Sequence, residues 1–109
     1  MYKIEKINEL IKQELGKIIL EEEELEPGVL ATIMAADTTE DLKEATISFS
    51  VFPTEQGQKV LKRFEAHIYN LQQRLNKIIK THPVPKIRFI LDTTEAEGQN
   101  IETLLNKLK

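Results

Sequence analysis

One segment, residues 54–81, constrains the fold of this chain more than any other. Its apolar residues recur in steps of three or four: Val60, Phe64, Ile68, Leu71, Leu75 and Ile78. Residues at these steps share one face of an α-helix, so the segment predicts a long helical stretch with a core-facing side. The residue before each of them is cationic or polar: Lys59, Arg63, His67, Asn70, Arg74 and Lys77. One residue corresponds to about 100° of helix rotation, which predicts that this basic row, free of acids, runs beside the buried face.

The charge of the chain is distributed in blocks. The net charge is −3, but residues 1–55 carry 5 Lys against 13 Asp and Glu, whereas residues 56–91 carry 8 Lys and Arg against the single acid Glu65. A one-signed block in an oppositely charged chain indicates a local positive field, and therefore an anionic partner. The alternative is a solvated helix face whose charge is balanced by the acidic N-terminal region.

The chain lacks the residues that several classes of function require. The chain contains no cysteine, which excludes disulfides, zinc–thiolate sites and thiol nucleophiles. His67 and His82 have no partners at a recognisable catalytic or metal-binding spacing, and no glycine-rich phosphate loop is present. We therefore expect no enzymatic activity, no cofactor, no metal and no small-molecule substrate. The absence of a long apolar run predicts a cytoplasmic protein without a membrane partner, and 109 residues predict a single domain, 1–109, which we expect to be monomeric.

The other elements follow from periodicity and from breaking residues. A first helix is expected from Lys3 to about Glu21, followed by the run Glu21–Glu24, interpreted as a solvated helix end or loop. Strands are predicted at 29–36, 45–52 and 86–91, the first two as a hairpin linked by 37–43 and the third paired beside them, with Phe89 in the core. Thr54 is the expected N-cap of the long helical stretch, which Pro83 and Pro85 end. A last helix is marked by a capping-box spacing at 94–97 and by Ile101, Leu104, Leu105 and Leu108.

Two blocks carry a resemblance to a known family. The first is Asp41-Leu42-Lys43-Glu44-Ala45, and the second is Val84-Pro85-Lys86-Ile87-Arg88-Phe89-Ile90-Leu91-Asp92 followed by Gly98. Together with their spacing, these blocks resemble bacterial ribosome-binding factor A over nearly the whole chain. The resemblance implies an α+β fold of the type II KH-like class, with the order helix-strand-strand-helix(-helix)-strand plus a C-terminal helix and a three-stranded sheet with helices packed on one face.

The same resemblance implies a function. It is that of a non-enzymatic factor in late maturation of the small ribosomal subunit, which binds the ribosomal RNA of that subunit near the decoding region. The basic side chains expected to contact RNA are Lys59, Arg63, His67, Arg74, Lys77, Lys80, His82, Lys86 and Arg88. Contacts of this kind address phosphates and RNA shape more than bases. The alternative is a protein-interaction module on the same fold, which uses its acidic N-terminal third to meet a basic protein.

The chain departs from the family pattern at the middle of the long helical stretch. The Ala-x-Gly kink of the family falls on His67-Ile68-Tyr69, and an expected Arg is Gln72. Tyr69 cannot readily take a positive φ, and the apolar steps keep their helical phase across the site. The sequence therefore predicts a continuous helix, or a modest bend, with Tyr69 turned toward solvent or RNA. The alternative is that packing imposes the kink despite the substitution.

Overall fold

The computed structural model describes residues 2–80 and 83–93 of the chain. Seven elements follow one another: α1 (Tyr2–Glu22), β1 (Leu30–Thr38), β2 (Glu44–Phe52), the 3₁₀ helix η1 (Thr54–Gln56), α2 (Gly57–Ala66), α3 (Ile68–Ile78) and β3 (Lys86–Leu91). The first helix and the three predicted strands are confirmed, with β3 at its predicted bounds. The helix expected over 94–108 lies outside the described residues.

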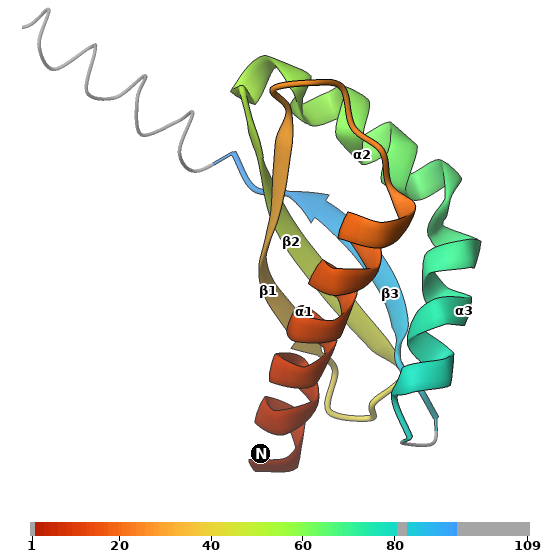
Figure 1. Ribbon diagram of the computed structural model, residues 1–109. Helices are drawn as coiled ribbons and strands as arrows, with labels where there is room; N and C mark the ends of the chain where they lie inside the picture. Colours follow the sequence, from red (N-terminus) through yellow and green to blue (C-terminus); the bar gives the residue numbers. More distant parts are fainter. Residues whose placement is uncertain (1, 81–82, 94–109) are drawn as a thin grey trace, which may run out of the picture.

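The three strands form one sheet in the order β1-β2-β3. β1 and β2 are the predicted antiparallel hairpin, with a bulge between Ile33 and Ala35. β3 pairs with β2 in parallel, from Glu44 opposite Lys86 to Phe49 opposite Leu91. A parallel neighbour requires a crossover connection, and here α2 and α3 together provide it. The basic helical stretch is therefore the crossover that carries the chain from β2 to β3 (Figure 1).

The core lies between one face of the sheet and all three helices. Along β2 every second side chain is buried, which confirms the alternation read from the sequence. Phe49 of β2, Phe64 of α2 and Phe89 of β3 form an aromatic cluster with ring centroids 4.9–5.9 Å apart. α1 contributes its buried stripe to the same core: Ile7, Ile11, Leu15, Ile18 and Ile19. The predicted α+β layout, with helices on one face of a three-stranded sheet, is confirmed.

The long helical stretch is interrupted at one residue, His67. Of the two predicted forms, a continuous helix or a modest bend, the continuous helix is wrong, and the break agrees with the alternative in which a kink is kept. α2 ends at Ala66, α3 begins at Ile68, and His67 between them has φ −104° and ψ 11°, outside the helical region. The two helices then run in different directions (Figure 1). Tyr69 is turned toward solvent as predicted, with 76% of its surface exposed.

Packing accounts for the interruption, and the buried row departs from its prediction only at its last position. α2 packs against β2 and β3, whereas α3 packs against α1 and β3, so the two helices have different supports. In α3 the buried residues are Leu71 and Leu75, and the next buried residue is Ile79, just after the helix, while Ile78, predicted to be buried, is exposed. The start of the stretch also differs from its prediction. Thr54 is not an N-cap, because the chain enters through η1 after Pro53 without a side-chain cap.

Candidate nucleic-acid interface

The basic row faces the glutamates at the end of α1. We call residues 21–26 the acidic segment. Lys59 pairs with Glu26, Arg74 pairs with Glu22, and the Nη2 atom of Arg74 lies 2.6 Å from Oε2 of Glu21. Asn70, also in the row, donates a hydrogen bond to Glu22 over 3.1 Å. The acidic segment therefore neutralises the row from Lys59 to Arg74, and its last member, Lys77, lies beyond these contacts.

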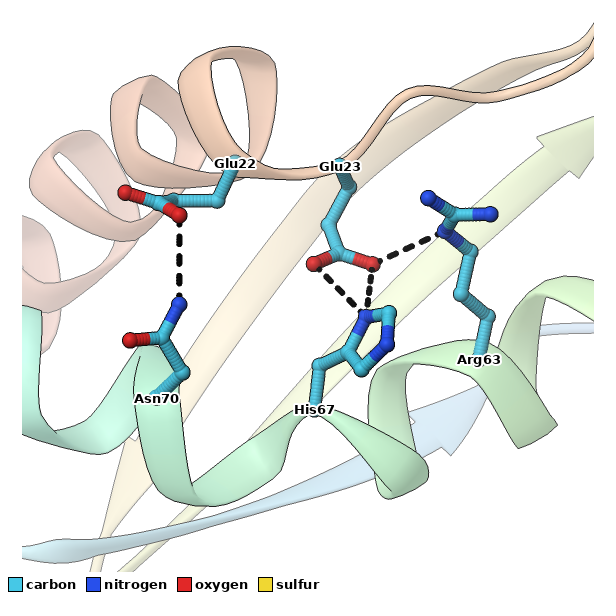
Figure 2. Close-up of polar contacts among 5 residues, drawn as sticks. All are labelled: Glu22, Glu23, Arg63, His67 and Asn70. Atoms are coloured by element: carbon cyan, nitrogen blue, oxygen red, sulfur yellow. Dashed lines mark hydrogen bonds and ion pairs between the residues drawn. The ribbon is translucent and has the colours of Figure 1, made fainter.

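Glu23 is the centre of this contact (Figure 2). Its side chain is only 2% exposed, and Oε1 accepts a hydrogen bond from Nε of Arg63 over 3.0 Å. Nδ1 of His67 lies 2.9 Å and 3.0 Å from the two carboxylate oxygens, a geometry suited to the tautomer protonated at Nδ1. A carboxylate withdrawn from water needs such partners, because its desolvation is otherwise uncompensated. The interpretation of Glu21–Glu24 as a solvated helix end or loop holds for the exposed Glu21 and Glu24 and is wrong for Glu23, which is buried.

The electrostatics of Arg74 follow from the same contacts. The hydrogen bond to Glu21 and then the one to Glu22 raise the pKa of the Arg74 guanidinium further above its ordinary value. Its positive charge is thus committed to the glutamates of α1. Four residues predicted to bind RNA have intramolecular acidic partners: Lys59, Arg63, His67 and Arg74. For these four, a role in RNA binding stays a prediction, and it requires a phosphate to replace a carboxylate.

A second group of cations is free of such pairing. Within residues 2–80 and 83–93, no ion pair involves Lys77, Lys80, Lys86 or Arg88. Lys77 lies in the last turn of α3, Lys80 follows it, and Lys86 and Arg88 are exposed on β3. His82 lies outside the described residues. These cations occupy the end of the molecule where α3 stops and β3 starts (Figure 1).

The turn between β1 and β2 adds a residue that the sequence analysis did not select. The amide of Lys86 donates a hydrogen bond to the carbonyl of Lys43 over 2.9 Å, which brings the exposed Lys43 to the same end. We call this group the basic end: Lys43, Lys77, Lys80, Lys86 and Arg88. The sequence separates Lys43 from the others by more than thirty residues. Only the parallel pairing of β2 with β3 brings it next to Lys86.

Local hydrogen bonds hold the basic end in shape. Gln72 of α3 donates to the carbonyl of Pro85 over 3.1 Å and accepts from the amide of Ile87 over 2.8 Å, so it ties α3 to the start of β3. Gln72 stands where the resemblance led us to expect an Arg, and its amide makes both contacts as donor and acceptor.

The turn that carries Lys43 is organised by Asp41. Its Oδ1 atom accepts hydrogen bonds from Oγ1 of Thr39 over 2.6 Å and from the amide of Lys43 over 3.1 Å. The bond from Thr39 and then the one from Lys43 lower the pKa of the Asp41 carboxyl. Between them Leu42 adopts φ 62°, a region that non-glycine residues rarely occupy, and its half-buried side chain packs against the core. The turn is therefore held by the hydrogen bonds to Asp41 on its solvent side and by the packing of Leu42 on its core side.

Among the described residues, no three His, Asp or Glu side chains are grouped so that they could hold a metal ion. In the same part of the chain, no helix has both the length and the apolar character needed to span a membrane.

The sequence is similar to those of known proteins. The sequence model of the family described as Ribosome-binding factor A matches residues 3–105. Among similar proteins, ribosome-binding factor A of Akkermansia muciniphila is 26% identical over 95% of this chain and 82% of its own length. That of Coprothermobacter proteolyticus is 28% identical over 96% of this chain and 77% of its own length.

Solved structures show the same fold. The crystal structure of ribosome-binding factor A from Thermus thermophilus superposes with a TM-score of 0.69 at 19% identity, covering 81% of this chain and 94% of that one. A homology model of the Thermus thermophilus protein, fitted into a cryo-EM map of its complex with the 30S subunit, gives 0.66 at 18% identity, covering 79% and 91%. These similarities confirm the predicted KH-like fold.

Proposed function

This chain belongs to the ribosome-binding factor A family, and from that premise we propose that it is a non-enzymatic assembly factor that binds the small ribosomal subunit during late maturation. The family match supports ribosome binding, and the 30S complex of a similar protein supports the small subunit as partner. We further propose that the contact is made to ribosomal RNA, by a cytoplasmic monomer without a small-molecule substrate.

The observation that carries the RNA part of this proposal is the basic end. Five cations lie there, from the turn between β1 and β2, from the end of α3 and the residue Lys80 after it, and from β3, and no ion pair within the described chain involves them. Lys and Arg on such a surface suit the phosphates of folded RNA, which a protein reads largely through shape and backbone contacts. Of the residues predicted to bind RNA, we therefore assign direct phosphate contacts to Lys77, Lys80, Lys86 and Arg88.

The protein-interaction alternative loses part of the feature that suggested it. It relied on free acids in the N-terminal third of the chain. Four of these acids, Glu21, Glu22, Glu23 and Glu26, are bound to the basic row. A basic protein would have to compete with intramolecular partners for them.

Charge reversal at the basic end tests the proposal. We expect the double variant Lys77→Glu, Lys86→Glu to lose affinity for purified small subunits by about 100-fold at low salt, because phosphate contacts dominate affinity for nucleic acid. The slope of log affinity against log salt should become shallower by roughly 1.4 if two single-strand phosphate contacts are lost.

The matched control is Lys12→Glu, Lys17→Glu, which changes the net charge equally but lies on α1. Sedimentation with small subunits and with a small-subunit RNA fragment should separate the two variants. Equal losses from both pairs would mean that only net charge matters and would overturn the assignment of the basic end. Binding to subunits without binding to any RNA fragment would overturn the RNA part alone.

A further inference from the structure

A hollow of about 470 Å³ lies between α3 and the start of β3, and its lining residues are Gln72, Asn76, Val84 and Lys86. This volume falls in the range of about 300–1,000 Å³ that is typical of small-ligand sites, so it suits a single nucleotide. Lys86 belongs both to the hollow and to the basic end, whereas Asn76 and Val84 belong to neither the basic row nor the basic end.

Two backbone partners fix the orientation of the Gln72 side-chain amide. Its oxygen accepts from the amide of Ile87 over 2.8 Å, and its nitrogen donates to the carbonyl of Pro85 over 3.1 Å. A backbone N–H only donates and a backbone carbonyl only accepts, so the oxygen and the nitrogen of this side chain cannot be exchanged. The nitrogen also donates to Oδ1 of Asn76 over 3.0 Å, which uses its second hydrogen.

Gln72 in turn fixes the amide of Asn76. Because the nitrogen of Gln72 is a donor, Asn76 must face it with its oxygen, and the Nδ2 atom of Asn76 is then the group left to meet a ligand. No ion pair among the described residues involves Lys86. The hollow therefore offers donors, the Nδ2 atom of Asn76 and the ammonium of Lys86, beside the apolar surface of the half-buried Val84.

We propose that the hollow binds one unpaired nucleotide of RNA and selects a base that carries a carbonyl oxygen. This inference rests on the proposed function and deepens it. A phosphate oxygen would accept from Lys86, the base would cover Val84, and a carbonyl oxygen of the base would accept from Nδ2 of Asn76. Unpaired bases suit such a site because their edges are open to side chains.

The donors of the hollow predict which base is preferred. Uracil carries a carbonyl oxygen on either side of its ring N–H, whereas adenine carries an amino group and no carbonyl. An asparagine that binds adenine through two hydrogen bonds uses its own oxygen as an acceptor, but the oxygen of Asn76 is already bound to Gln72. None of the described residues that line the hollow is aromatic, so hydrogen bonding and not stacking sets the preference. Uracil is therefore favoured over adenine.

Titration of the full chain with hexauridylate and with hexaadenylate tests the site. We expect hexauridylate to bind about fivefold more tightly, the size of one net hydrogen bond, and to shift the NMR signals of the Asn76 side-chain amide and the Lys86 backbone amide. Equal affinities, or an unchanged Asn76 signal, would overturn the proposal. Hexaglutamate is the third probe, and a shift of Asn76 as large as that with hexauridylate would assign the hollow to an acidic polypeptide and overturn the nucleotide.

A matched pair of variants separates base selection from charge. Asn76→Asp keeps an acceptor for Gln72 and replaces the donor by a carboxylate oxygen, so the preference for hexauridylate should fall from about fivefold to none. Gln73→Glu adds the same charge at another exposed position of α3 and should weaken both oligonucleotides alike, with the preference kept. A preference that survives Asn76→Asp would overturn the role of Asn76. Both positions are exposed, so both variants should keep the unfolding midpoint of the parent.

Sedimentation with purified small subunits separates this proposal from the proposed function. A chain that binds subunits but binds neither oligonucleotide, or binds both equally, would contradict the nucleotide site alone. A chain that prefers hexauridylate but does not bind subunits would contradict the proposed function and leave the nucleotide site supported.

Discussion

The basic row and the basic end look alike in the sequence and differ in the folded protein. Nearly all their cations come from the one positively charged block, residues 56–91. In the structure, Lys59, Arg63 and Arg74 are neutralised by the acidic segment, whereas Lys77 and Lys86 have no acidic partner among the described residues. The comparison shows that a count of charges locates a basic block but not the surface on which its field acts.

The reason for the difference is the position of α1. This helix packs against α3 and β1, which carries its C-terminal turn over the break between α2 and α3. That turn holds Glu21 and Glu22 and no basic residue, an unfavourable arrangement at the negative end of a helix dipole. Arg74 supplies the missing positive charge from α3. The row therefore stabilises the end of α1, and the cations beyond its reach stay available.

The largest expected effect tests whether the two regions belong to one cooperative unit. Phe89 lies beneath both, in contact with Phe49 and Phe64. Phe89→Ala should lower the free energy of unfolding by about 3 kcal/mol, because it leaves a cavity in the aromatic cluster. Denaturant unfolding measures the loss, with Tyr69→Ala as an exposed aromatic control expected within about 0.5 kcal/mol of the parent. An unchanged midpoint for Phe89→Ala would contradict the shared core.

The next largest effect is the loss of stability expected when the charge of Glu23, at the buried centre of the neutralised region, is removed. Glu23→Gln removes the charge that Arg63 and His67 face and should cost on the order of 2 kcal/mol, less than a fully buried pair because both partners are partly exposed. Glu24→Gln is the matched control, since Glu24 is exposed and adjacent. Indistinguishable unfolding midpoints for the two variants would mean that the contact contributes nothing to stability.

A smaller effect, on RNA affinity, is expected from a variant in which the neutralised region becomes a second basic surface. Removing three charges with Glu21→Gln, Glu22→Gln and Glu26→Gln should free Lys59 and Arg74. We expect RNA affinity to rise about fivefold at low salt, with a slope against log salt steeper by roughly 1.4 if two single-strand phosphates are gained.

The control for that variant removes the same charge from α1 before the acidic segment: Glu5→Gln, Glu9→Gln and Glu14→Gln, of which Glu14 pairs only with Lys17 of the same helix. Its affinity should rise less, and its salt slope should stay that of the parent. Identical curves for the two triple variants would assign the gain to net charge and would remove the distinction between row and end.

The smallest effect concerns the turn at the basic end. The pKa of Asp41 is lowered in the folded state, so its contribution to stability is present above the unfolded value, about 3.9, and is lost as pH falls through the folded value. Asp41→Asn should therefore be slightly less stable than the parent at pH 6, and the difference should vanish toward pH 2. Thermal unfolding over that range measures it. A difference independent of pH would assign the effect to turn geometry alone.

Local patterns in the sequence were sufficient to locate the strands and the first helix. Alternation from Ala45 to Val51 identified β2, its buried face and its approximate ends. Successive side chains of a strand point to opposite faces, so this pattern does not depend on which elements pack against the sheet. The stripe on residues 3–21 identified α1 for the equivalent helical reason. Pro83 and Pro85 marked the stretch between the crossover and β3, because proline restricts its own backbone and that of the residue before it, although α3 already ends at Ile78.

Tertiary structure decided everything that depended on residues distant in the chain. The apolar phase across His67 is compatible with one helix or two, and the break follows from the different supports that α2 and α3 find on the sheet and on α1. Glu23 lies in a run of glutamates that a local reading places in water, yet it is buried against side chains 40 and 44 positions away. Charge interactions act through space, so the sequence determined which residues carry charge, and the fold alone determined which of those charges remain free.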